Sequence, residues 1–148
     1  MSEPKKTFYC PHCGQKLSFL DGSMVKLEGL LEAPAFTVRT TFFIPAELGR
    51  YGAIVGGNVE LQEGARVEFF CINARCSANF TALYNPDLAE IRMVDETGRD
   101  FVVVFNKIYG RRATFVVDRR ARQLLGSYGE HAAAYAQTFD RPLNYFGA

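Results

Sequence analysis

The chain has 148 residues, of which 48% are hydrophobic and 22% are charged, and these values are typical of one globular domain. Its formal net charge of +1 excludes the strong overall field of dedicated nucleic-acid or acidic-membrane binders. No signal peptide is recognised at the N-terminus, and the densest apolar run, residues 101–105, is too short to cross a bilayer. We therefore expect a cytoplasmic protein with no membrane partner, in which thiols stay reduced.

The first half of the chain has the composition of short strands separated by turns. Alternating apolar residues, or runs of β-branched and aromatic residues, mark these strands. The segment 58–61 and the alternating segment 65–70 are expected to form a hairpin, because Gln62-Glu63-Gly64 between them is a turn signal. Strands are expected at residues 15–20, 24–31, 36–44, 58–61, 65–70 and 79–84, with a brief pairing at 53–55.

The segment from residue 90 to residue 117 is predicted to be a three-stranded meander. Residues 90–95 and 101–108 flank Glu96-Thr97-Gly98-Arg99, which is a hairpin signal. A second turn at residues 109–112 leads into the β-branched segment 113–117.

The C-terminal region changes to a helical period. Its apolar residues recur at spacings of three and four, as on one face of a helix. Asp118 is a candidate N-cap, Gly126 interrupts the pattern, and Ser127-Tyr128-Gly129-Glu130 has the form of a capping box. We expect a short helix, a break, and a second helix that continues to about Thr138. The apolar positions are Ala121, Leu124, Leu125, Tyr128, Ala132, Tyr135, Ala136 and Phe139.

The four cysteines of the protein form two short clusters that lie far apart in the sequence. Cys10 and Cys13 belong to Cys-Pro-His-Cys-Gly, and Cys71 and Cys76 close a longer turn. Two such clusters suit one tetrahedral metal ion, with zinc favoured over iron. Four sulfur ligands leave no open position for water or substrate, so the predicted site is structural. Four thiols without metal are the alternative interpretation.

These residues resemble known metal-binding knuckles. Cys10-Pro11-His12-Cys13-Gly14 resembles the first knuckle of zinc-ribbon and rubredoxin-like domains, and Cys71 to Cys76 is similar to the longer second turn of some topoisomerase-type ribbons. Leu61 to Cys71 also resembles small bacterial zinc-ribbon proteins of uncharacterised function. The second turn departs from the family because it lacks Cys-x-x-Cys-Gly. The long separation of the two turns, residues 14–70, implies an inserted sheet.

The expected fold class is α+β: a β-rich zinc ribbon with inserted strands, followed by a β-meander and C-terminal helices. Residues 1–88 are expected to form the zinc-ribbon-like half with its inserted sheet. Residues 89–148 are expected to form the meander and the helical segment, packed with the first half as one unit.

The chain offers no recognisable catalytic set, because neither His12 nor His131 has a partner that the sequence nominates. We therefore expect a non-catalytic, metal-stabilised protein-interaction module or accessory subunit that binds another protein or a larger complex. The aromatic C-terminal tail, with Tyr145 and Phe146, is the candidate partner-binding segment. The sequence identifies no small-molecule substrate.

Two other functions are kept as hypotheses. A basic cluster with interleaved aromatic residues is a candidate nucleic-acid contact, although a solvated surface explains the same residues. Cys-Pro-His-Cys is also the active-site motif of a strongly oxidising thiol-disulfide oxidoreductase, but that chemistry needs a helix beginning at Cys10, and no helical period appears before residue 119. The basic cluster consists of Lys107, Arg111, Arg112, Arg119, Arg120 and Arg122.

Overall fold

The structure of the protein is a computed structural model, and it describes residues 6–19, 22–32, 37–48, 51–57, 61–82, 85–121, 123–133 and 135. These residues form antiparallel strands and contain no α-helix. The strands are β1 (Thr7–Tyr9), β2 (Ser18–Phe19), β3 (Met24–Glu32), β4 (Thr37–Pro45), β5 (Ile54–Val55), β6 (Arg66–Phe70), β7 (Leu88–Val94), β8 (Asp100–Asn106), β9 (Thr114–Asp118) and β10 (Leu124–Tyr128).

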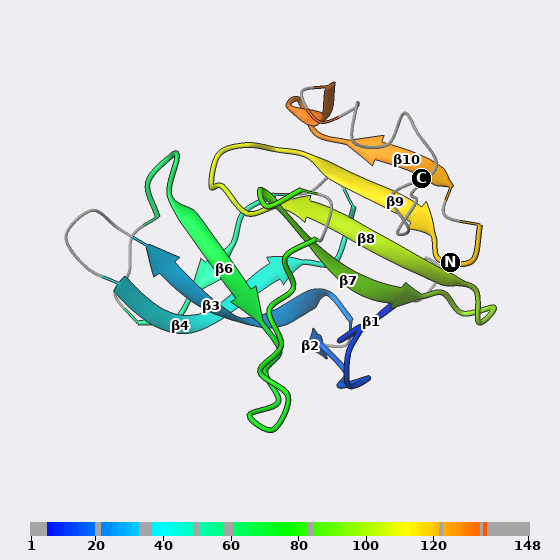
Figure 1. The fold of residues 1–148 in the computed structure, drawn as a ribbon, viewed down its shortest axis with the longest axis horizontal. Coiled ribbons are helices and arrows are strands. Elements are labelled where there is room, and N and C mark those ends of the chain that lie inside the picture. Colours follow the sequence, from blue (N-terminus) through cyan, green and yellow to red (C-terminus); the bar gives the residue numbers. More distant parts are fainter. Residues whose placement is uncertain are drawn as a thin grey trace.

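The first sheet has the strand order β1-β7-β8-β9-β10, and it is visible across the upper right of Figure 1. The predicted meander is confirmed, since β7 pairs with β8 and β8 with β9. Gly98 has a φ of 85° in the turn between β7 and β8, a conformation that glycine adopts without steric cost. β1 comes from the other end of the chain and pairs with β7, with Phe8 opposite Met93.

The second sheet has the order β2-β3-β4-β5, and β6 also pairs with β3. β3 and β4 pair over nine residues, from Met24 opposite Pro45 to Glu32 opposite Thr37. β2 and β6 share the other edge of β3, because β2 pairs with residues 24–25 and β6 with residues 28–32. The strands expected at 24–31, 36–44 and 65–70 are confirmed in their described residues. Residues 58–60 of the expected hairpin lie outside the described residues. Of the expected strand 79–84 the structure describes residues 79–82, which make isolated bridges at Asn79 and Thr81.

One apolar core lies between the two sheets. In β3, buried and partly exposed residues alternate, as expected for a strand with one face packed inward. Gly29 breaks the row of side chains in β3, and a Cβ at this position would overlap the Phe42 ring. The absence of a side chain at Gly29 therefore lets this aromatic ring lie against the strand. Buried members of the core from both sheets are Phe8, Leu27, Phe42, Val67, Phe69, Ile91, Met93 and Val103.

A second, smaller cluster covers the opposite face of the first sheet. Val104, Phe115 and Val117 point away from the main core, and Tyr135 packs against them at the end of the described chain. The first sheet is therefore covered on both faces along β8 and β9, which explains why β9 is buried at four successive positions, Thr114 to Val117.

The prediction of C-terminal helices is wrong, and with it the α+β fold class, because the described residues are nearly all β. Residues 124–128 form β10, which pairs antiparallel with β9. Asp118 does accept hydrogen bonds from the backbone N–H groups of Arg120 and Ala121, at 3.0 and 2.8 Å. These are the bonds of an N-cap, but here they close the turn between two strands. Residues 136–148, which include the predicted end of the helix, lie outside the described residues.

The helical pattern failed because its apolar residues are not buried on one face. Leu124 and Leu125 are 38% and 46% exposed, so the strand gains little from burying them. The backbone of β9, by contrast, needs a partner on the side away from β8, since buried N–H and C=O groups are costly to leave unpaired. Pairing of β10 with β9 satisfies these groups, and the sequence pattern contains no signal for this tertiary demand.

Candidate metal centre

The first cysteine turn follows β1 and folds as a tight knuckle. The N–H groups of His12 and Cys13 both donate to the Cys10 sulfur, at 3.3 and 3.4 Å. The Gly14 N–H donates to the Cys10 carbonyl at 3.0 Å, and Gly14 has a φ of 78°. The left-handed residue after the second cysteine turns the chain back toward β2, as glycine at this position predicts.

The second cysteine turn follows β6 and repeats this geometry with a longer loop. The Asn73 N–H donates to the Cys71 sulfur at 3.4 Å, and the N–H groups of Cys76 and Ser77 both donate to the Asn73 carbonyl at 2.9 Å. Ser77 has a φ of 47°. It therefore occupies the same left-handed position after its cysteine as Gly14, although the sequence lacks a glycine there.

The two knuckles bring all four sulfur atoms together. The Sγ atoms of Cys10, Cys13, Cys71 and Cys76 lie within 4.8 Å of one another. The Cys10–Cys76 and Cys13–Cys71 sulfur pairs are 3.9 and 3.6 Å apart. A disulfide needs about 2.05 Å, whereas four sulfurs at about 2.3 Å from one tetrahedral ion lie about 3.8 Å apart. The four cysteines can therefore hold a metal ion.

The four thiols differ in burial, and Cys76 is intermediate between the buried and the exposed ones. Cys10 and Cys71 are buried, and this burial raises the pKa of each thiol. Cys13 is exposed, and a hydrogen bond from the Gln15 backbone lowers its pKa. Thiols must lose their protons to bind a metal. Burial disfavours the negative charge of a thiolate at Cys10 and Cys71, and a dication between the sulfurs would stabilise that charge.

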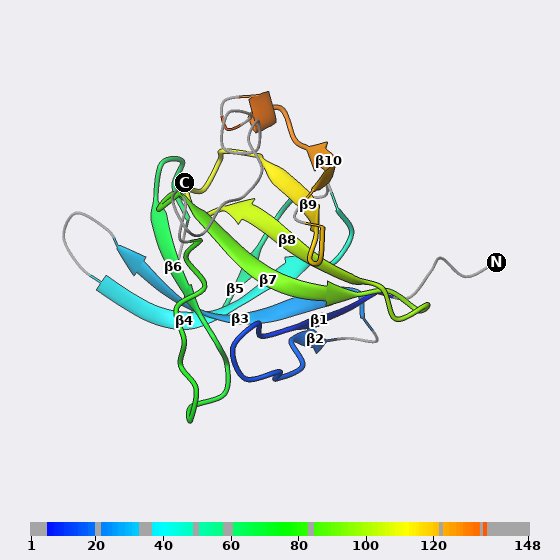
Figure 2. The ribbon, with the colours of Figure 1, turned by 45° about the vertical axis from the view of Figure 1, so that its right-hand side comes forward.

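The four-cysteine cluster lies where the two connections between the sheets meet. The first knuckle carries the chain from β1 of the first sheet to β2 of the second. The second knuckle carries it from β6 of the second sheet toward β7 of the first, through the bridge between Thr81 and Ala89. In Figure 2 the loops after β1 and after β6 extend from the same end of the molecule. An ion held by both knuckles would tie both crossings at one point.

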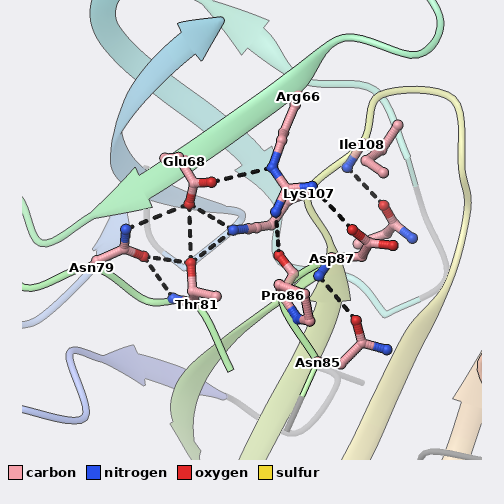
Figure 3. A network of polar contacts seen from close by, with 10 residues as sticks. Arg66, Glu68, Asn79, Thr81, Asn85, Pro86, Asp87, Lys107 and Ile108 are labelled. Atoms are coloured by element: carbon pink, nitrogen blue, oxygen red, sulfur yellow. Dashed lines mark hydrogen bonds and ion pairs between the residues drawn. The ribbon is translucent and has the colours of Figure 1, made fainter. Parts of the chain in front are cut away.

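A buried ion pair next to the second knuckle was not predicted from the sequence. The Lys107 ammonium, on a residue that is 2% exposed, donates to Glu68 Oε2 at 2.6 Å and to Thr81 Oγ1 at 2.7 Å, as Figure 3 shows. Burial alone would raise the Glu68 pKa, but the hydrogen bonds of Lys107 and Thr81 outweigh it and hold this pKa at about 2. Arg66 extends the network, because it contacts Glu68 at 3.3 Å and Asp87 at 3.0 Å.

The described residues of the predicted basic cluster lie in three places of the fold. Lys107 is buried in its ion pair and is not a surface cation. Arg111 and Arg112 lie in the loop before β9, and Arg119 and Arg120 lie in the turn after it. The five residues of β9 alone separate these pairs by about 13 Å. Arg119 is also 3.5 Å from the Asp100 carboxylate.

The remaining residues that the sequence analysis singled out belong to neither the cysteine cluster nor the ion-pair network. Arg122, Tyr145 and Phe146 lie outside the described residues. The exposed His12 contributes only its backbone N–H to the Cys10 sulfur among the contacts of the described chain. His131 accepts a hydrogen bond from the Arg112 N–H at 3.0 Å through Nδ1, and this bond connects the segment after β10 to the loop before β9.

The chemistry of a thiol-disulfide oxidoreductase is not favoured by this geometry. A reactive cysteine of that kind lies exposed at a helix N-terminus, where its pKa is lowered. Cys10 is buried, its pKa is raised, and the chain that follows it in the described residues is a knuckle and a strand.

Comparisons of the chain with protein-family models, with curated proteins and with solved structures return no match. Across the described residues, no helix has both the length and the hydropathy that are needed to cross a bilayer.

Proposed function

We propose that the protein is a non-catalytic, zinc-stabilised interaction module of the zinc-ribbon type, with one structural Zn²⁺ bound by Cys10, Cys13, Cys71 and Cys76. The observation that carries the proposal is the closed group of four sulfurs, all within 4.8 Å of one another. Zinc is preferred because four thiolates in tetrahedral arrangement are its usual structural ligand set. Four protein ligands complete the coordination, which argues against catalysis at the ion.

The ion has a clear structural role in this fold. Both knuckles lie on connections between the two sheets, and β2 contributes only two residues to the second sheet. A structural zinc site contributes about 10–16 kcal/mol of binding free energy in small zinc-binding peptides. That is as large as the whole stability of a typical domain, about 5–15 kcal/mol. Removal of the metal is therefore expected to separate the knuckles and to unfold the sheets that meet there.

Metal analysis of the purified full-length protein tests this part of the proposal. We expect one zinc per chain, a colourless protein, and loss of tertiary structure on treatment with a strong chelator. Cys10→Ser and Cys71→Ser should lose the metal. His12→Ala, which changes a residue between two ligands without removing a sulfur, is the matched control and should keep one zinc per chain. A well-folded wild-type protein without metal would contradict the proposal, and a red protein would indicate iron.

The interaction surface that the described residues favour is the outer edge of β10. Leu125 is 46% exposed and Tyr128 is 38% exposed, and in the described part of the chain only β9 pairs with β10. An exposed apolar edge strand can add a further strand from a partner protein through backbone hydrogen bonds. An extended protein segment is therefore the proposed partner.

Site-specific crosslinking tests the proposed partner edge. A photo-crosslinking amino acid at Leu125 should give one discrete adduct with a protein of the native host. The same amino acid at Glu96, in the exposed turn between β7 and β8, is the control and should not give this adduct. Equal labelling from both positions would refute binding at this edge. A Leu125 adduct that persists in variants that disrupt β10, such as Gly126→Pro, would refute it as well.

A further inference from the structure

A cavity of about 340 Å³ lies between the two sheets, and none of the four cysteines lines it. Its inner wall is aromatic and comes from both sheets, with Phe8 on β1, Phe42 on β4, Phe69 on β6 and Phe105 on β8. Protein interiors are close-packed and contain few voids larger than a water molecule. Pockets that bind small molecules begin at about 300 Å³ and are mainly apolar. The cavity therefore has the size of a small ligand site, and its lining combines aromatic with polar residues.

Described residues of the loop before β5 and of the loop before β9 line the mouth of the cavity. Tyr51, which precedes β5, shares a hydrogen bond of 2.9 Å with Thr114 Oγ1, and its hydroxyl donates to the Tyr128 carbonyl at 3.2 Å. The Arg112 guanidinium lies over the Tyr51 ring, 5.8 Å from its centroid. These contacts connect the loop before β5 to the open end of the β9–β10 hairpin, where Thr114 and Tyr128 lie opposite each other. They hold the aromatic ring and the cation beside each other at the mouth.

Two successive arginines at the mouth have little carboxylate pairing. The Arg111 guanidinium donates to the Tyr135 hydroxyl at 3.2 Å and is 3.9 Å from the Asp87 carboxylate. The Arg112 guanidinium has no carboxylate partner among the described residues. Three carboxylates also line the mouth and reduce its overall field, so a bound anion would be recognised by short hydrogen bonds and not by a long-range potential. These carboxylates are Glu47, Glu63 and Glu130.

We propose that this cavity binds a small amphiphile with an apolar body and a carboxylate head. The body would lie between the phenylalanine rings, and the carboxylate would accept hydrogen bonds from Arg111 and Arg112. A guanidinium matches a carboxylate in a planar, bidentate geometry. A volume of about 340 Å³ corresponds to about eleven water-sized groups at about 30 Å³ each, so a saturated chain of about ten carbons fits.

The test uses the full-length protein with its metal and three probes that share one tail. Decanoate, decanol and decylammonium are each titrated below their micelle concentrations, and binding is followed by calorimetry and by shifts of the backbone amide resonances. Decanoate is expected to bind at least tenfold more tightly than decanol, and decylammonium more weakly than both. The largest amide shifts are expected in the loop that carries Arg111 and Arg112 and along β4 and β8.

Variants locate the two ends of the ligand. Arg111→Gln together with Arg112→Gln should weaken decanoate binding at least tenfold and leave decanol binding unchanged. Arg120→Gln, in the turn at the other end of β9, is the matched control and should change neither. Ala53→Leu adds bulk to a residue that lines the cavity, and it should weaken decanoate and decanol alike.

Three results would overturn the proposal. The first is absence of binding of decanoate and decanol at millimolar concentration, which would show that the cavity takes no ligand of this size. The second is equal affinity for decanoate and decanol, or tighter binding of decylammonium, since the arginines would then not select the head. The third is decanoate binding that Ala53→Leu or the double arginine variant leaves unchanged, which would place the ligand elsewhere.

Discussion

Replacement of Lys107 by methionine tests the buried ion pair that joins β6, the segment after the second knuckle and the end of β8. Methionine keeps most of the apolar stem of Lys107 and removes its ammonium. Glu68 then keeps contacts to Thr81 at 3.0 Å and to Arg66 at 3.3 Å but loses its shortest contact, at 2.6 Å. Removing one partner of a buried pair costs about 3–5 kcal/mol.

The pKa of Glu68 gives a second measure of how much the ion pair contributes to the free energy of unfolding. A pKa held at about 2 in the folded protein, against an ordinary value of 4.5, corresponds to about 3 kcal/mol of stability. Because the folded-state pKa is the lower one, this contribution is fully present above pH 4.5. It is lost as the pH falls from about 4.5 to about 2.

Urea denaturation of the wild-type protein and of Lys107→Met between pH 7 and pH 2 measures both quantities. At pH 7 we expect Lys107→Met to be less stable by about 3 kcal/mol, and this difference should shrink toward zero at pH 2. Lys26→Met removes a cation that lies over the Phe19 ring on the surface, and it should cost less than about 1 kcal/mol at every pH. If Lys107→Met behaves like Lys26→Met, and its stability runs parallel to wild type down to pH 2, the reasoning is refuted.

Three further substitutions test local features by urea denaturation. Ser77→Gly should stabilise the metal-bound protein by up to about 1 kcal/mol, because a φ of 47° is unfavourable for a residue with a Cβ. A loss of stability would mean that the Ser77 hydroxyl contributes more to stability than its backbone conformation costs. Gly29→Ala should destabilise by about 1–3 kcal/mol, since the added methyl overlaps the Phe42 ring, and an unchanged stability would show that this ring moves freely. Asp100→Asn should cost about 1 kcal/mol, because Arg92 contacts both carboxylate oxygens at 2.7 and 2.9 Å. The pKa of Asp100, lowered mainly by the hydrogen bonds of Arg92, implies that this cost disappears as the pH falls below about 3.8.

The cysteine cluster was predictable from the sequence because its chemistry is mainly local. Each turn is short, and a turn that ends on two cysteines directs both sulfurs to one side. The sequence therefore indicated four ligands for one site, and the structure brings their sulfurs together. The role of Ser77 was not predictable, because a left-handed serine has no compositional signal. It follows from the two hydrogen bonds to the Asn73 carbonyl that close the second knuckle.

The burial of Lys107 was not predictable from the sequence, because tertiary contacts decide its exposure. Lys107 lies four positions before Arg111 in the sequence, and no local pattern distinguishes it as a buried cation from the exposed Arg111 and Arg112. In the fold, the backbone at Lys107 follows the end of β8, and its side chain enters the space between Glu68 and Thr81. The partners come from residues 39 and 26 positions away, so their pairing depends on the register of the sheets.

The sequence by itself determined the strands of the meander, the long strands of the second sheet and the cysteine ligands, because alternation, turn residues and short ligand spacings act within a few residues. Only the tertiary structure decided that residues 124–128 form β10, that the knuckles lie on the two crossings between sheets, and that a cavity remains between the phenylalanine rings. The physical reason is that strand pairing and burial join residues far apart in the chain. A helical period in the C-terminal region did not decide the structure, because the buried backbone of β9 would otherwise lack a hydrogen-bonding partner on the side away from β8.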